Sequence, residues 1–249
     1  MDDAELLREA AAALDVALND AQIAQFMLFR DLLLDWNTRM NLTTITEPRA
    51  VVTRHFVDAL TCLVGVAPTL RDQTVRVLDV GSGAGLPGLA LAIALPHWRV
   101  VSLESTGKKV HFQEAVITAL ALPNATAVQE RAETLAHALG WRDSFAVVTA
   151  RAVAALPTLL EWCQPFAQVG GVVLAAKKGD IGAELVQGAN AATIFGGAAP
   201  ETLALPSALM ALVPELADGR VIIRVQQQFA CHLRYPRAGS APMKLPLGA

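Results

Sequence analysis

The chain has 249 residues, of which 53% are hydrophobic and 17% charged, and its net charge is −3. This length fits one domain with an appendage, and the apolar content excludes an intrinsically disordered chain. No apolar run reaches the roughly 18 residues of a membrane-spanning helix, and the acidic start 1–5 lacks the basic opening of a secretory signal. Three widely spaced cysteines match neither a disulfide framework nor a zinc pattern. We therefore expect a soluble, cytoplasmic protein without a bound metal ion.

The first part of the chain predicts helices. Apolar residues recur with helical spacing over about 3–14 and 20–36, and Glu47-Pro48 predicts the start of a third helix that runs to about 64. We expect residues 1–70 to form an N-terminal helical extension that precedes a second unit, 71–249.

From residue 75 onward, strand-like and helix-like runs alternate, which is typical of a parallel sheet with helices on both faces. Two late apolar runs, 192–205 and 220–229, flank the turn signal Asp218-Gly219 without a clear helix between them. They predict an antiparallel pair at one edge of the sheet. The earlier expected strands cover 75–80, 99–103, 125–129, 145–149 and 170–175, and the expected helices cover 86–95, 107–121, 131–138, 153–166 and 181–191.

A glycine-rich turn follows the first expected strand. Gly81, Gly83 and Gly85 allow positive φ and carry no Cβ, so a ligand can approach the main chain closely where the next helix begins. A tight strand-to-helix turn without a ligand would use the same residues. A dinucleotide motif would have a third glycine at the position of Leu86, and this departure favours S-adenosylmethionine, which has no pyrophosphate. Asp79, which precedes the glycines, is also typical of methyltransferases.

Charged side chains end two further strands. In open α/β sheets, ligands bind beyond the carboxyl ends of the strands. Glu104 lies 23 residues after Gly81, and a carboxylate there can accept hydrogen bonds from a ribose diol. Arg151 follows the fourth expected strand, where its planar guanidinium can orient cofactor or substrate. The alternatives for these two residues are a solvated loop carboxylate and a surface ion pair.

The charges are unevenly distributed along the chain. Residues 1–47 carry a net charge of −6, whereas residues 219–249 carry five basic residues and no acid. This asymmetry predicts a face that could meet a polyanion such as RNA. Compositional bias toward arginine is the alternative, since Arg outnumbers Lys fifteen to five.

Several stretches, ordered along about residues 30–247, resemble the bacterial small-subunit ribosomal RNA guanine-N7 methyltransferases, the family of glucose-inhibited division protein B. The longest is the sequence from Asp79 to Gly88, which resembles the family's signature. The shorter stretches are Trp36-Asn37, Asn41–Thr43, Arg54–Leu60, Lys108–Phe112, Ala150–Val153, Gly170-Gly171, Lys177–Gly179 and Arg234–Arg237.

The resemblance implies a class I S-adenosylmethionine-dependent methyltransferase fold, Rossmann-like, over residues 71–249, with a mostly parallel sheet, an antiparallel edge strand and a basic C-terminal tail. It implies methyl transfer from S-adenosylmethionine to N7 of guanine 527 in 16S rRNA of the small ribosomal subunit. We also expect the protein to be a monomer. Guanine N7 has an available lone pair, so the reaction needs no general base and can depend on proximity. The alternatives are methylation of another RNA site or a small molecule, and a non-catalytic nucleotide-binding regulatory role.

The resemblance also assigns site residues. Glu104 stands where the family commonly has Asp, Leu86 where Phe is common, and Lys109 where Arg is frequent. Arg234 and Arg237 flank Tyr235-Pro236, a combination suited to unpaired RNA bases, although a tail packed on the sheet is the alternative. The expected catalytic residue is Arg151. The expected cofactor-binding residues are Gly81, Gly83, Leu86, Glu104, Ser105, Thr106, Ala132, Glu133 and Arg151. The expected RNA-binding residues are Arg54, Lys108, Lys109, Lys177, Arg234 and Arg237.

Overall fold

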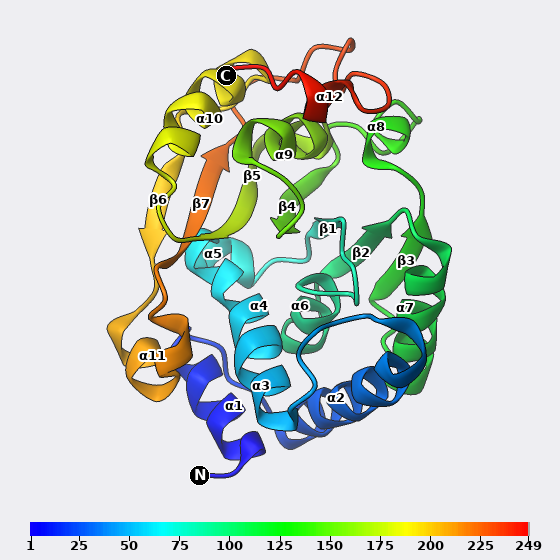
Figure 1. Cartoon of the computed structure of the whole chain (residues 1–249), viewed down its shortest axis with the longest axis vertical. Coiled ribbons are helices and arrows are strands. Elements are labelled where there is room, and N and C mark those ends of the chain that lie inside the picture. Colours follow the sequence, from blue (N-terminus) through cyan, green and yellow to red (C-terminus); the bar gives the residue numbers. More distant parts are fainter. Residues whose placement is uncertain (249) are drawn as a thin grey trace.

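Residues 1–248, described by a computed structural model, fold around one seven-stranded sheet (Figure 1). The strand order is β3-β2-β1-β4-β5-β7-β6, in which β1 to β5 are parallel and β7 runs antiparallel to both β5 and β6. The strands are β1 (Arg76–Val80), β2 (Arg99–Glu104), β3 (Ala125–Gln129), β4 (Phe145–Arg151), β5 (Ala167–Lys178), β6 (Glu201–Ala204) and β7 (Arg220–Gln226).

The order of the strands changes direction at β1, so that β1 and β4, which are not consecutive in the sequence, lie side by side. From β1 it proceeds outward through β2 and β3, and then crosses back to β4 and on to β5. Leu78 at the centre of β1 therefore pairs with Val101 on one side and Val148 on the other. In such doubly wound sheets the ligand crevice lies at this switch point, beyond the carboxyl ends of the strands.

The helices that follow the five parallel strands lie where the apolar pattern predicts them, whereas the short helix near the C-terminus was not predicted. Pro87 precedes the first of these helices, which begins at Gly88, and Lys108-Lys109 lie in the first turn of α7. These helices and their short extensions are α6 (Gly88–Ala94), α7 (Gly107–Ala119), α8 (Ala132–Leu135), α9 (Leu156–Cys163), η3 (Gln164–Phe166), α10 (Gly182–Ile194) and α12 (Ala241–Lys244).

The N-terminal segment is helical, as predicted, but its third helix changes geometry along its length. Glu47 caps the start by accepting hydrogen bonds from the backbone N–H groups of Arg49 and Ala50. The middle, Val52–Val57, is a π-helix, a geometry that is rare and frequently occurs at functional sites. The elements of this segment are α1 (Asp3–Ala12), α2 (Asp20–Met40), α3 (Pro48–Val51), η1 (Val52–Val57), α4 (Asp58–Leu60), η2 (Thr61–Gly65) and α5 (Pro68–Arg71).

The N-terminal helices share a hydrophobic core with the sheet. One cluster of buried side chains continues from α1 and α2 through α6 and α7 to β1 and β2. In it, the Phe29 ring lies 5.2 Å from Phe56 and 6.3 Å from Phe112. A second cluster lies among β4, β5, α9 and α10. No helix within residues 1–248 is both long enough and apolar enough to span a membrane.

The prediction of no helix between the two late strands is wrong. α11 (Ser207–Leu212) and the 3-10 turn η4 (Pro214–Leu216) connect β6 to β7. Leu209, Val213 and Leu216 are fully buried there, and α11 contacts α1. The segment was missed because six helical residues are too few to show a clear period, and packing against α1 stabilises them. The antiparallel pair itself is confirmed, although β6 is only four residues long.

Candidate active site

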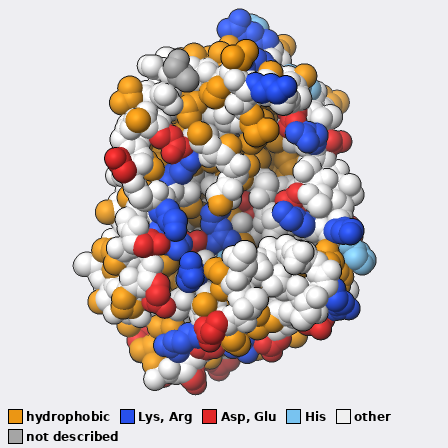
Figure 2. Space-filling view, viewed as in Figure 1, with side chains coloured by type: hydrophobic (Ala, Val, Ile, Leu, Met, Phe, Trp, Pro, Cys, Tyr) orange, Lys and Arg blue, Asp and Glu red, His pale blue; other side chains and the backbone are white. Residues whose placement is uncertain are grey.

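Two cavities adjoin at the carboxyl edge of the parallel strands. The smaller has a volume of about 150 Å³ and the larger about 470 Å³. They meet at the end of β4, where Val153 lines the smaller cavity, and Arg151 and Ala152 line the larger. Figure 2 shows a hollow near the centre of this face, with Lys and Arg side chains on both sides of it. Two separate cavities therefore lie beyond the ends of the strands at the switch point.

The glycine turn forms the floor of this region. Gly81, Gly83 and Gly85 all have positive φ, of +69°, +60° and +84°. A Cβ at Gly81 would lie 2.9 Å from a methyl carbon of Val153, whereas a Cβ at Gly83 would meet no atom within 4 Å. Gly81 is therefore needed for the packing of the site, and the open space beside Gly83 is available to a ligand.

The buried side chain of Asp79 connects the end of the glycine turn to the neighbouring strand. Its fully buried carboxylate accepts hydrogen bonds from the Gly88 backbone N–H at 2.7 Å and from the Thr149 hydroxyl at 3.3 Å. Burial raises the pKa of Asp79 to about 7. The side chain lines neither cavity, so its contacts tie β1, β4 and the start of α6 together beneath the site.

Glu104, an expected cofactor residue, is buried and already bonded to backbone. One carboxylate oxygen accepts the Gly83 N–H at 3.0 Å, and the other accepts the Thr106 N–H at 2.8 Å. Glu104 therefore connects the glycine turn to the end of β2. The Ser105 hydroxyl also donates to Oε1 at 3.5 Å, whereas Oε2 keeps a lone pair that can accept from a ribose hydroxyl.

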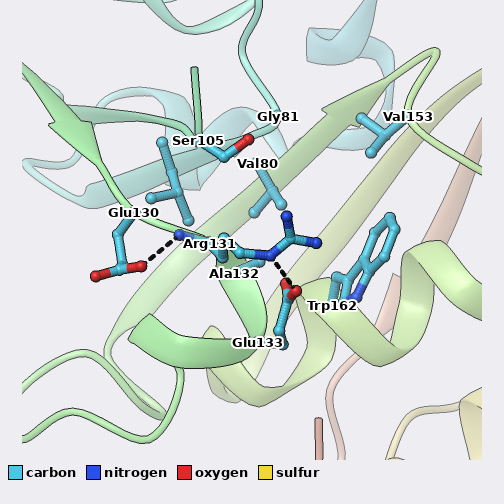
Figure 3. Close-up of a pocket in the computed structure, with 10 residues that line it drawn as sticks. Val80, Gly81, Ser105, Glu130, Arg131, Ala132, Glu133, Val153 and Trp162 are labelled. Atoms are coloured by element: carbon cyan, nitrogen blue, oxygen red, sulfur yellow. Dashed lines mark hydrogen bonds and ion pairs between the residues drawn. The ribbon is translucent and has the colours of Figure 1, made fainter. Parts of the chain in front are cut away.

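The smaller cavity lies among the ends of β1 and β2, the turn before α8, and α9 (Figure 3). Ser105, Ala132 and Glu133 line it, as expected of cofactor contacts, whereas Thr106 contributes only through its backbone bond to Glu104. The expected contact Leu86 is buried in the core and lines neither cavity.

Arg131 and Trp162 are among the lining residues of this cavity that were missed from the sequence. Figure 3 shows the Arg131 guanidinium extending over the cavity toward Trp162, and Arg131 pairs with the buried carboxylate of Glu133. The indole N–H of Trp162 is buried and has no acceptor among the described residues. Arg131 could have been found, because the sequence from Glu130 to Glu133 directly follows the end of a strand. Trp162 could not, because it lies within an apolar helix and shows no separate pattern.

The larger cavity is organised by one carboxylate. Asp58 accepts a hydrogen bond from Arg151 Nη1 at 2.7 Å and also pairs with Arg220 of β7. His55, one turn earlier, donates to or accepts from the Thr43 hydroxyl at 2.8 Å through Nε2. Burial, and then the charge of Arg151, lower the pKa of His55 to about 4, so the imidazole is neutral at pH 7. The π-helical turn places His55 and Asp58 on this wall.

The expected RNA-binding residues separate into three groups. Arg54 is exposed and lines the larger cavity, whereas Lys108 and Lys109 lie in the first turn of α7 and line neither cavity; none of the three has an ion pair among residues 1–248. Lys177 also lines the larger cavity, but its ammonium donates to the Ala154 carbonyl at 2.8 Å and pairs with Glu184. The third group, in the C-terminal segment, lines neither cavity.

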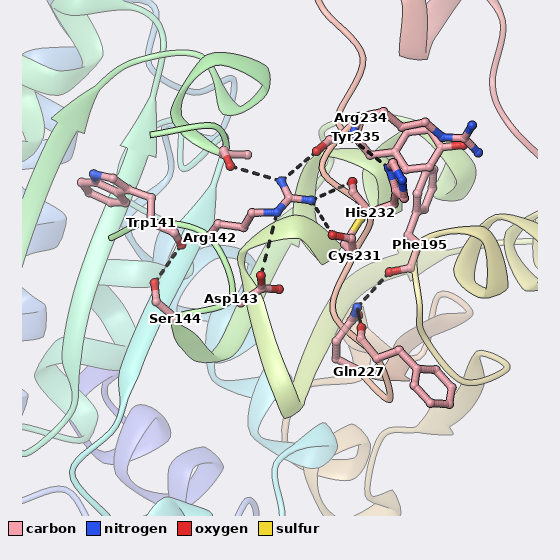
Figure 4. Close-up of polar contacts among 12 residues, drawn as sticks. Trp141, Arg142, Asp143, Ser144, Phe195, Gln227, Cys231, His232, Arg234 and Tyr235 are labelled. Atoms are coloured by element: carbon pink, nitrogen blue, oxygen red, sulfur yellow. Dashed lines mark hydrogen bonds and ion pairs between the residues drawn. The ribbon is translucent and has the colours of Figure 1, made fainter. Parts of the chain in front are cut away.

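The C-terminal segment, residues 227–248, packs on the molecule through Arg142 (Figure 4). The Arg142 guanidinium donates to the carbonyls of Cys231, His232 and Tyr235 at 2.7 to 2.8 Å. The Tyr235 ring is buried edge-on against Phe195, with centroids 5.0 Å apart. Tyr235 therefore has no free face for an RNA base, and the packed-tail alternative describes this segment.

Most of the basic residues near the C-terminus are paired within the chain. Arg237 binds the fully buried carboxylate of Glu161 through two side-chain nitrogens, at 2.9 and 2.7 Å. Arg224 pairs with Glu201 at 3.0 Å. Arg234 remains exposed, 4.7 Å from the centroid of its neighbour's ring. The excess of positive charge seen in the sequence is thus largely neutralised on the surface, and the RNA contacts of Arg234 and Arg237 stay predictions.

The fold is that of class I S-adenosylmethionine-dependent methyltransferases. The chain is similar to a predicted O-methyltransferase from Agrobacterium tumefaciens, with a TM-score of 0.51 and 18% identity over 68% of this chain and 79% of that one. It is also similar to the fibrillarin pre-rRNA processing protein of Methanococcus jannaschii, with a TM-score of 0.50 and 13% identity over 70% and 74% of the two chains.

The sequence relationship is more specific. Residues 22–206 match the model of the GidB family, described as rRNA small subunit methyltransferase G, and the chain belongs to this family. Proteins named ribosomal RNA small subunit methyltransferase G are 39% identical in Geobacillus kaustophilus, over 93% of this chain and 94% of that protein, and 38% identical in Roseiflexus sp., over 98% and 99%. The family resemblance and the fold predicted from the sequence are therefore confirmed.

Proposed function

We propose that the protein transfers a methyl group from S-adenosylmethionine to N7 of guanine 527 in 16S rRNA of the small ribosomal subunit, in the cytoplasm. Membership of the small-subunit rRNA methyltransferase G family supports the reaction class. The observation that carries the proposal is the pair of adjoining cavities, which provides one compartment for the cofactor and a second for RNA on either side of residues 151–153.

The smaller cavity fits the cofactor. Val80, Leu103 and Trp162 give it apolar walls that suit an adenine ring, and the backbone at Gly81 is bare. The buried Trp162 N–H without a protein acceptor indicates a polar partner that the chain itself does not supply. When bound, S-adenosylmethionine supplies an electrophilic methyl group. Glu104, Ser105 and Glu133 would hold its polar groups.

Two carboxylates and the imidazole that line the cavities are poorly suited to act as a general base. Asp58 is shared by two guanidinium groups, and Glu133 is paired with Arg131. With a pKa of about 4, the imidazole of His55 is a weak base. Guanine N7 needs none, because its lone pair attacks the methyl carbon without loss of a proton. A site that supplies position and in-line orientation is therefore sufficient for this acceptor.

Arg151 is the proposed catalytic residue. It ends β4 at the boundary of the two cavities, and Asp58 fixes its guanidinium through Nη1. Its Nε and Nη2 have no acceptor among residues 1–248. These free donors face the larger cavity, where they can orient the acceptor nucleotide.

Incubation of the purified protein with methyl-labelled S-adenosylmethionine and small-subunit particles that lack the mark tests the proposal. We expect label in N7-methylguanosine after digestion of the RNA. Absence of label, or label in another nucleoside, would contradict it. Calorimetry with S-adenosylmethionine and NAD addresses the regulatory alternative, which would require binding of NAD without S-adenosylmethionine.

A further inference from the structure

The wall of the larger cavity carries more cations than carboxylates. Only two carboxylates, Asp58 and Glu184, line it, and Asp218 lies just outside, within 2.9 Å of Arg220. Even with Asp218 included, the wall keeps a net positive charge. The cationic side chains of the wall are Arg54, Arg151, Lys177, Lys178 and Arg220.

Several guanidinium donors of this wall are unused. Arg220 donates through Nε to Asp218 at 2.9 Å and through Nη1 to Asp58, but its Nη2 has no acceptor within residues 1–248. The guanidinium of Arg54 is exposed and likewise has no acceptor in the described part of the chain. Asp58 and Asp218 hold the half-buried Arg220 in place, so its free edge is preorganised and costs little entropy to use.

This charge is unsuited to the methylated base itself. Methylation at N7 makes the guanine ring cationic, and a cationic ring gains nothing from a wall of guanidinium groups. A phosphodiester has the opposite charge, and its oxygens accept the paired donors that a planar guanidinium offers.

We propose that the larger cavity binds a phosphodiester of the RNA strand next to the acceptor nucleotide, with Arg220 and Arg54 as its principal donors. The inference rests on the proposed function for the identity of the strand. Arg220 comes from β7, 162 residues away from its partner Asp58, and completes a substrate site from the antiparallel edge of the sheet.

Arg220→Gln tests the subsite in the full-length enzyme. We expect KM for unmethylated small-subunit particles to rise about tenfold, with kcat within about threefold of wild type. The slope of log affinity against log salt should fall in magnitude by about 0.7, as for one lost single-strand phosphate contact. Arg224→Gln is the matched control, because it removes the same charge from the same strand, where Arg224 pairs with Glu201 outside the cavity. The control should keep the wild-type KM and slope.

Arg54→Gln makes the test independent of folding. Arg54 is exposed and unpaired in the described structure, so its removal leaves no buried charge. We expect KM to rise about fivefold and the salt slope to fall as above. Wild-type KM and slope in both Arg220→Gln and Arg54→Gln would overturn the proposal.

A nucleotide-binding measurement separates this proposal from the proposed function. With the enzyme saturated by S-adenosylhomocysteine, guanosine 5′-monophosphate should bind at least about fivefold more tightly than guanosine in an NMR titration, and Arg220→Gln should remove the difference. Equal binding of the two compounds would overturn the subsite even if the enzyme methylates guanine N7. Inorganic phosphate should compete with the monophosphate only at higher concentration, and a free-phosphate site, in which it competes equally well, would contradict recognition of an RNA strand.

Discussion

The larger cavity and the C-terminal segment are both rich in arginine, but their guanidinium groups meet different partners. In the segment, Arg237 is bonded to the buried Glu161, and Arg142 of the neighbouring loop is bonded to backbone carbonyls. In the cavity, Arg151 and Arg220 share one carboxylate and keep donors that face open space. Unused donors, more than the number of charges, therefore distinguish the region where we propose that a polyanion binds.

We expect the largest effect on stability from the loss of Arg237, which pairs with a buried carboxylate. Arg237→Ala leaves the fully buried carboxylate of Glu161 without its charged partner, which should lower the free energy of unfolding by about 3 kcal/mol. For a chain of this size, the melting temperature should fall by about 6–12 °C. Arg234→Ala is the control, since Arg234 has no carboxylate partner in the described structure. Equal melting temperatures of the two variants would contradict the structural assignment of Arg237.

Arg151→Ala should act on turnover more than on folding. Loss of the guanidinium at the boundary of the two cavities should lower kcat/KM about 100-fold, because the acceptor is no longer held in line. Arg151→Lys keeps the charge but not the planar donors, and should recover only part of the rate. Steady-state methylation of small-subunit particles gives the rates, and thermal unfolding separates them from stability. An unchanged rate for Arg151→Ala would exclude the catalytic role.

Gly83→Val should weaken cofactor binding about tenfold. The added side chain would occupy the open space beside the turn, which holds no protein atom within 4 Å of the new Cβ. Gly140→Val is a matched control, because Gly140 also has a positive φ and open space around it but does not belong to the glycine turn after β1. Both variants carry the backbone strain of about 1–2 kcal/mol, so they differ only in whether the added side chain stands at the glycine turn. Calorimetry with S-adenosylhomocysteine should show normal affinity for Gly140→Val, and normal affinity for Gly83→Val would mean that the turn has no ligand role.

The smallest effect is expected for an arginine of the C-terminal segment, which can be compared with an arginine of the larger cavity. Arg234→Ala removes an exposed charge of the C-terminal segment, and we expect KM for small-subunit particles to change by no more than about twofold. The comparison with Arg54→Gln, measured at the same ionic strength, gives the relative weight of the segment and the cavity. A larger effect for Arg234→Ala than for Arg54→Gln would place the main RNA contact on the segment.

The convergence of the glycine turn and Glu104 at one edge of the sheet could be predicted from the sequence, because both follow the ends of strands. Gly81 and Glu104 each come directly after an apolar run, and parallel strands bring such ends to one edge. The larger cavity could not be predicted in this way. Asp58 lies directly after the π-helical turn and Arg220 begins β7, and no local pattern in the sequence shows that these two residues meet.

The contacts of the C-terminal segment could not be predicted either, because they join residues that are distant in the sequence. Net charge along the sequence does not show which arginines are neutralised, since Glu161 lies 76 residues before Arg237 and within an apolar helix. Likewise, Tyr235 beside two arginines has the composition of an RNA-binding motif, but its ring packs on Phe195. In both cases, the contacts that these side chains make are determined by tertiary packing.

In the proposed function, the two cavities hold the cofactor and the RNA while guanine N7 of small-subunit rRNA is methylated. Mapping of N7-methylguanine in 16S rRNA from cells with and without the gene tests it most directly. We predict that the mark at guanine 527 disappears without the gene, returns with the wild-type gene, and does not return with Arg151→Ala at equal protein abundance. Persistence of the mark without the gene, or loss of a mark at another nucleotide instead, would contradict the account.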